Sequence, residues 1–262
     1  MSSRNRRRRQ QDPRRARARP SALRGAETKH RRSRLLGALA AALTLGGVGA
    51  GSAIALSGGA AGAKSPQTRL DVEPASRLGS LEPPPLQDML GPEGVAVPRA
   101  AVLASTDRGA AGSPVDGVSC DTSEQVVYHI HAHLTVFVNG VQRQVPPGIG
   151  VPVPQAEPTP QGPFVVSGAC FYWLHTHAAD GIIHVESPAQ RRYTLGQFFD
   201  LWGQVLSPTR VGDVIGRVVA FYNGGHVLSD PRAIPLTAHA DIQLDVGAPL
   251  VGPVVVPSWG GL

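Results

Sequence analysis

The most regular hydrophobic pattern in the chain is a strict alternation over residues 128–138. Successive side chains of a β-strand point to opposite faces of the sheet, so this pattern predicts a strand with one apolar face. The apolar set is Ile130, Ala132, Leu134, Val136 and Val138, and the opposite set begins with His129, His131 and His133. The Asn139-Gly140 pair that comes next is typical of a two-residue hairpin turn, with a return strand over 141–145.

A second hairpin is predicted over residues 171–186, and it carries four more polar groups at two-residue spacing: His175, His177, His184 and Glu186. If Asp180 and Gly181 form a two-residue turn, His177 pairs with His184 across the hairpin. If the loop has four residues instead, His175 pairs with His184. In both registers these side chains share the face opposite the apolar residues.

The remaining pattern predicts one helix and two further strands. Thr194 and Gln197 form a capping box, and the helix presents an apolar stripe made of Leu195, Phe198, Phe199 and Trp202. Strands are expected over 217–222, before an Asn223-Gly224 turn, and over 238–246. The order predicts an α+β domain with one helix packed on a small mixed or antiparallel sheet, in a β-grasp-like arrangement.

Composition divides the chain around this domain, which we place at residues 119–247. Residues 57–118 are rich in Gly, Ala, Pro and Ser and show no sustained apolar period, which predicts a flexible linker. Residues 248–262 are expected to be a Gly- and Pro-rich C-terminal tail.

Charge is concentrated at the N-terminus. Residues 1–34 hold 14 Lys and Arg against two acids, a charge of +12; the whole chain carries +6, so the rest carries −6. The acidic remainder argues against nucleic-acid binding by the globular domain, because phosphate contacts need Lys and Arg. We expect the arm to be disordered and cytoplasmic.

Residues 35–56 are 22 residues without a charged side chain, long enough to cross a bilayer as a helix. The arginines before them predict a single span with its N-terminus in the cytoplasm and the domain outside. A cleaved signal peptide is the alternative, with a cut near Ala63 that would release a secreted protein. In either case the two cysteines, Cys120 and Cys170, reach an oxidising compartment, which predicts a disulfide between them.

The clustered histidines are the candidate metal ligands. Neutral imidazoles with a nearby carboxylate suit transition metals, so the pattern predicts a zinc or copper site. We expect His175, His177 and His184 as primary ligands, with Glu186 and one or two of the histidines at 129–133 in support. Affinity should then fall as the pH drops through about 6.5.

Two other interpretations remain open at this stage. One is a protein-interaction module whose histidine-lined face responds to pH. The other is a metal-dependent hydrolase with Glu186 or Asp180 as base. The string from Leu174 to Gly181 is similar to the opening motif of the polymerase-and-histidinol-phosphatase phosphoesterases, but Asp180 is one position off and the domain is shorter than theirs. No motif identifies a protein partner.

The strings CFYWLHTH (170–177), GIIHVESP (181–188) and TLGQFF (194–199) together resemble a group of secreted or membrane-anchored prokaryotic proteins. The resemblance covers residues from about 125 to 246. It implies an exported or anchored protein, and it implies no particular activity.

Overall fold

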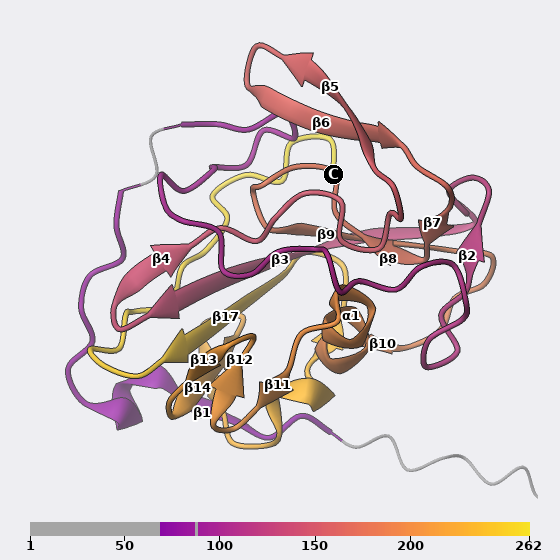
Figure 1. The fold of residues 1–262 in the computed structure, drawn as a ribbon. Helices are drawn as coiled ribbons and strands as arrows, with labels where there is room; N and C mark the ends of the chain where they lie inside the picture. The colour runs from indigo at the N-terminus through magenta and orange to yellow at the C-terminus, as the bar shows by residue number, and fades with distance from the viewer. Residues whose placement is uncertain (1–68, 87–88) are drawn as a thin grey trace, which may run out of the picture. The chain divides into compact units, whose positions relative to one another are not determined.

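The computed structural model describes residues 69–86 and 89–262, arranged around one mixed β-sheet (Figure 1). The eight strands run in the order β1 (Val72–Pro74), β15 (Gly225–Val227), β14 (Val218–Tyr222), β17 (Ala240–Val246), β3 (Tyr128–Val138), β9 (Ile182–Ser187) and β8 (Leu174–His175), with β4 (Val141–Arg143) also pairing with β3. The central pair, β17 and β3, is parallel, and every other neighbouring pair in this sheet is antiparallel. The predicted combination of a mixed sheet with one helix is confirmed for the described residues.

The apolar face of β3 packs against the helix α1 (Leu195–Trp202). Ala132, Leu134 and Val136 are at most 2% exposed and join the same core as Phe198 and Trp202. Both ends of α1 are fixed locally: Thr194 and Gln197 form the predicted capping box, and Gly203 ends the helix with a φ of 68°. Local capping and an apolar stripe therefore select the same helix.

Two predicted hairpin turns are present. Asn139 and Gly140 have φ angles of 50° and 76° between β3 and β4, and Asn223 and Gly224 have 48° and 81° between β14 and β15. A turn with positive φ at both central residues has a twist that matches that of the flanking strands. Asn and Gly adopt positive φ more readily than other residues, so Asn-Gly favours this turn.

Smaller ribbons surround the sheet. They are β2 (Cys120–Asp121) with β7 (Phe171–Tyr172), β5 (Gln155–Thr159) with β6 (Gly162–Ser167), β10 (Tyr193–Thr194) with β16 (Pro235–Leu236), and β11 (Leu206–Ser207), β12 (Arg210–Val211) and β13 (Val214–Ile215). Short 3-10 helices occupy Ala75–Leu78 and Pro231–Ala233. The predicted disulfide between Cys120 and Cys170 is confirmed.

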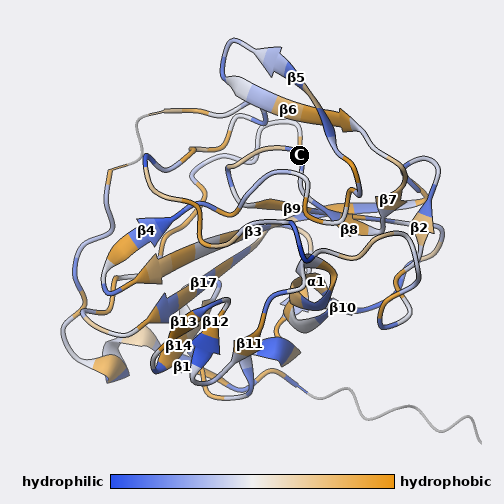
Figure 2. Cartoon of the chain, viewed as in Figure 1, coloured by the Kyte–Doolittle hydropathy of each residue, from blue (hydrophilic) through white to orange (hydrophobic). Residues whose placement is uncertain are grey.

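The histidine face of the sheet is covered by the β5–β6 hairpin and by two segments outside the predicted domain (Figure 1). Around β3, β9 and β8, α1 lies on one side and the β5–β6 hairpin on the other (Figure 1). On this second side Ile182 clusters with Val95 and Val256. Figure 2 shows that β3 mixes hydrophilic and hydrophobic positions and becomes uniformly hydrophobic toward Val138.

The prediction of a flexible linker is wrong for the described residues, and the Gly- and Pro-rich tail packs against the domain. β1 comes from the expected linker and pairs with β15, and Val95 is 4% exposed. Val251 and Val256 of the expected tail are also buried, at 2% and 7%. These segments show no periodic apolar pattern, but they contribute buried side chains such as Val95, Val251 and Val256.

The predicted arm at 1–34, the predicted span at 35–56 and the alternative cleavage near Ala63 lie outside the described residues. Within residues 69–86 and 89–262, no helix has both the length and the apolar composition to cross a membrane.

Candidate metal centre

Strand register brings the histidines of both predicted strand pairs together. β9 lies between β3 and β8, so His184 has His131 opposite it on one side and His175 opposite it on the other. On β3, His129 likewise pairs with Glu186. The hairpin adopts the register of the longer loop, and the two-residue turn at Asp180-Gly181 is not formed.

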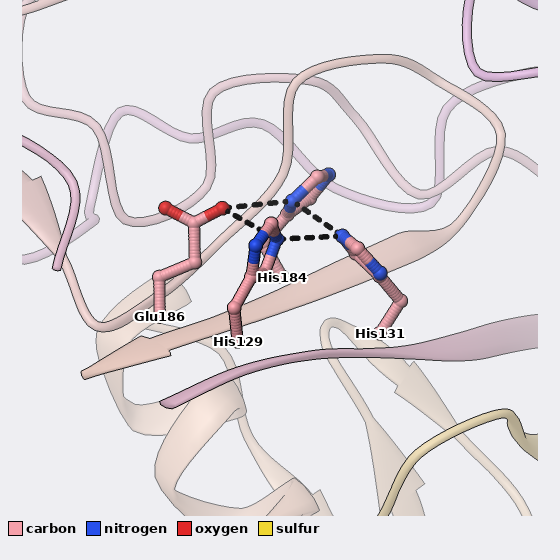
Figure 3. A group of neighbouring side chains, drawn as sticks. All are labelled: His129, His131, His184 and Glu186. Carbon is pink, nitrogen blue, oxygen red and sulfur yellow. Dashed lines mark hydrogen bonds and ion pairs between the residues drawn. The ribbon is translucent and has the colours of Figure 1, made fainter. Parts of the chain in front are cut away.

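Four donor atoms converge in a first group, made of His129, His131, His184 and Glu186 (Figure 3). His129 Nε2 lies 3.0 Å from both His131 Nε2 and Glu186 Oε1. His184 Nδ1 lies 3.1 Å from His131 Nε2 and 3.3 Å from Glu186 Oε1. A metal bound tetrahedrally at about 2.0–2.1 Å has ligand atoms about 3.3 Å apart, so these four separations are close to the edges of such a tetrahedron.

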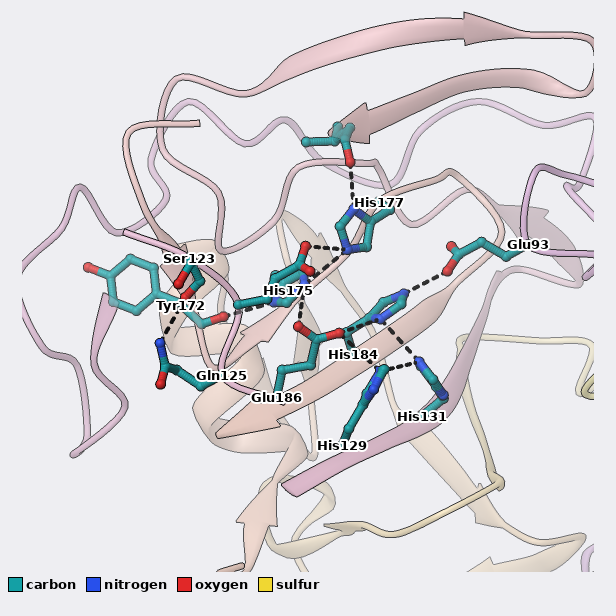
Figure 4. Close-up of polar contacts among 12 residues, drawn as sticks. Glu93, Ser123, Gln125, His129, His131, Tyr172, His175, His177, His184 and Glu186 are labelled. Atoms are coloured by element: carbon teal, nitrogen blue, oxygen red, sulfur yellow. Dashed lines mark hydrogen bonds and ion pairs between the residues drawn. The ribbon is translucent and has the colours of Figure 1, made fainter. Parts of the chain in front are cut away.

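A second group lies on the other side of His184, and its centre is the pair His175 and His177 (Figure 4). Their Nε2 atoms are 3.1 Å apart. His175 Nδ1 lies 2.8 Å from Tyr172 O, and His177 Nδ1 lies 2.5 Å from Val165 O. A carbonyl oxygen can only accept, so each Nδ1 carries a proton and donates it, and both Nε2 lone pairs point into the cluster.

Glu93 orients the shared histidine. Its Oε1 lies 2.6 Å from His184 Nε2, so this nitrogen is a donor and Nδ1 is left toward the first group (Figure 4). A carboxylate that accepts from the outer nitrogen of a ligand histidine fixes the ring and makes it more basic. Burial alone would lower the pKa of His184, but hydrogen bonds to Glu186 and Glu93 outweigh it and raise the pKa to about 9.

Burial keeps other rings of the cluster neutral. Desolvation, followed by the charges of His184 and His129, lowers the pKa of His131 to about 3. Desolvation also lowers the pKa of His177, and that of His175 well below its ordinary value. For Glu186, desolvation opposes ionisation, yet the hydrogen bond with His184 and the neighbouring histidines lower its pKa overall. His131, His175 and His177 therefore offer neutral imidazoles and Glu186 an ionised carboxylate, the forms that bind metals, whereas His184 must first lose a proton.

His133 belongs to neither group. Its Nε2 lies 2.8 Å from Asp180 O and its Nδ1 lies 3.4 Å from Thr135 Oγ1, so both ring nitrogens are committed elsewhere. Desolvation lowers its pKa to about 4. His133 is one pair further along β3, opposite Ile182, and the alternation that placed it on the correct face could not reveal this difference.

Two carboxylates at the site were missed in the sequence. Glu93 comes from the segment expected to be a linker, and Glu124 lies in the loop before β3, with Oε1 3.5 Å from His177 Nε2. Neither lies in a periodic segment, so no local signal identifies them. The Glu124 side chain is 37% exposed and that of His129 39%, which places the solvent-facing side of the cluster at these two residues.

Comparison of the chain with family models, with curated proteins and with solved structures found no match. The site itself consists of groups of histidine and glutamate side chains, mostly buried and close enough together to hold a metal ion.

Proposed function

We propose that the protein binds a divalent transition metal, with zinc as the best fit, at the first group. The observation that carries the proposal is the convergence of four donor atoms from His129, His131, His184 and Glu186, with every pair within 4.8 Å. Three of these residues are at most 7% exposed, and polar groups buried so deeply need a partner for their lone pairs.

The donor set favours zinc over copper. Three imidazole nitrogens and one carboxylate oxygen in a near-tetrahedral arrangement suit zinc, which has no geometric preference of its own, whereas copper(II) favours a square-planar or tetragonal arrangement. The thiolates that would favour copper(I) are missing, because Cys120 and Cys170 are joined to each other.

Binding rather than catalysis is the role that the first group supports. A tetrahedral ion there would use all four donor atoms, whereas catalytic zinc sites keep one position open for water or substrate. The alternative of a histidine-lined interaction face finds little support, because His131, His175, His177 and His184 are between 0% and 7% exposed.

Zinc titration of the full-length protein tests the proposal. Substitution His131→Asn removes a donor of the first group, and the matched control His226→Asn changes a histidine that pairs with Glu73 outside the site. We expect the His131→Asn variant to lose one tight site, with an affinity at least roughly 100-fold lower there, and the control to match the parent. Equal affinity and stoichiometry in all three proteins would refute the proposal.

We further infer that the domain acts outside the cytoplasm, anchored by residues 35–56 or released after cleavage near Ala63. The disulfide supports this inference, because such bonds persist in oxidising compartments. A reporter fused after Leu262 that is active only when exported should be active, and an inactive fusion that is stably produced would contradict the inference.

We also infer a β-grasp-like arrangement for the middle of the sheet. It is supported by the parallel central pair β3 and β17, by the antiparallel neighbours β9 and β14 outside them, and by the position of α1 between β9 and β14 in the chain.

A further inference from the structure

We propose that the cluster holds a second divalent ion, bound by His175 Nε2 and His177 Nε2 and joined to the first ion through Glu186. This inference rests on the proposed function, because it shares Glu186 with the first group. It adds a separate position with its own ligands and its own exposure to solvent.

The two histidine nitrogens require a cation between them. Both Nδ1 protons are given to backbone carbonyls, so the Nε2 atoms face each other as two acceptors at 3.1 Å. Two lone pairs at this distance cannot form a hydrogen bond unless one of them takes up an additional proton. Either a proton or a metal ion must therefore occupy the space that His175 and His177 share.

Glu186 distinguishes the metal from the proton. Its Oε2 is buried without a hydrogen-bond partner among the described residues, and it lies 3.9 Å from His175 Nε2. A proton shared by the two rings would leave this oxygen unpaired, at the cost of a buried charged group. A metal ion accepts both nitrogens and the oxygen together.

The two oxygens of Glu186 face different groups. Oε1 contacts His129 and His184 of the first group, and Oε2 is directed toward His175 of the second (Figure 4). A carboxylate that gives one oxygen to each of two ions is a common bridge, and two-metal sites hold their ions about 3.5–4 Å apart. His184 cannot be the bridge, because its Nε2 donates to Glu93.

The second position has a loop residue among its ligands. Glu124 is its fourth candidate ligand, and Glu124 lies with His175 and Glu186 in a group whose donor atoms are all within 4.8 Å of one another. Its side chain is 37% exposed, about as much as that of His129 in the first group, but all four residues of the first group lie on β3 or β9. We therefore expect the second ion to exchange faster than the first, because one of its ligands comes from a loop.

The experiment is a count of bound zinc per full-length chain, by elemental analysis after dialysis and by calorimetric titration. The test variant is His177→Asn, whose amide can keep the bond to Val165 O while Nε2 is lost. The control is again His226→Asn, and a chelator-treated unfolding curve shows whether each variant folds. We expect two ions in the parent and the control, and one in His177→Asn.

The ion counts separate the two proposals. One ion in the parent overturns the second site and leaves the first intact, and no ion overturns both. Two ions in folded His177→Asn would show that this histidine is not a ligand, which also overturns the second site. If His177→Asn does not fold, Glu124→Gln takes its place, and we expect the second affinity to fall at least roughly 10-fold with the first unchanged; an unchanged second affinity would count against the assignment.

Discussion

Zinc binding at the first group at pH 7 is expected to displace about one proton per chain, and that proton comes from His184. In the metal-free protein this ring lies between Glu93 and Glu186, which offset the effect of burial and raise its pKa to about 9. The ring is therefore almost fully protonated at pH 7, and its Nδ1 must give up the proton to reach the metal. Two pH units below the pKa correspond to about 3 kcal/mol, a roughly 100-fold loss of affinity relative to pH values above 9.

His131, the other buried histidine of the first group, should release no proton, because desolvation lowers its pKa to about 3. Calorimetric titrations in buffers of different ionisation enthalpy count the displaced protons, and the affinity should rise about tenfold per pH unit between pH 6 and 8. The sequence predicts that metal affinity falls as the pH drops through about 6.5. Glu93 and Glu186, which flank the His184 ring, move this fall to higher pH. The His226→Asn control should give the same count. A binding constant independent of pH over this range, or no released proton at pH 7, would refute the assignment of His184.

Two further predictions concern stability in the presence of a chelator. The pKa of His133 is about 4 in the folded protein and about 6.5 in the unfolded chain, so the unfolded chain binds more protons between these two pH values. The stability contributed by the neutral ring is therefore fully present above pH 6.5 and is lost as the pH falls through 4. The free energy of unfolding should fall by about 3 kcal/mol over this range. Urea unfolding of the His133→Gln variant should show a correspondingly smaller fall in the free energy of unfolding between pH 7 and 4. The same pH dependence in variant and parent would contradict this prediction. Replacing both Cys120 and Cys170 by Ser should lower the free energy of unfolding by about 4 kcal/mol, because the bond spans a sequence separation of 50, and a loss under about 1 kcal/mol would argue against loop closure as the mechanism.

Short-range sequence patterns predicted several elements of the fold correctly. The capping box of α1 and the two Asn-Gly turns depend on contacts within four residues, and all three are present. Alternation also assigned the faces of β3 correctly, because the strand period of two fixes each side chain without knowledge of its neighbours. The parallel pairing of β3 with β17 joins residues about 110 positions apart, and no local pattern specifies it.

Alternation fixed which side chains share a face but could not choose their partners. A shift of the β8–β9 hairpin by two residues keeps every parity and changes the residue opposite His184 from His177 to His175. The observed choice depends on the two residues after β8: Thr176 N donates to Ile149 O, and His177 O accepts from Val165 N. These contacts draw residues 176 and 177 away from β9, so register is decided by loops whose sequences show no strand pattern.

The same reasoning explains why the sequence identified the clustered histidines and missed Glu93. His129, His131 and His184 project from strands, and strand periodicity is visible in sequence. Glu93 needs only to bring one oxygen to His184 Nε2, and a loop held by Val95 against Ile182 can do this with a single buried contact. Its effect is nevertheless large, because a carboxylate 2.6 Å from a buried ring fixes the tautomer and raises the basicity of the nitrogen that faces the first group. Residues that tune a site can therefore come from segments that look like linkers, since orienting a ring demands one close contact and no repeating pattern.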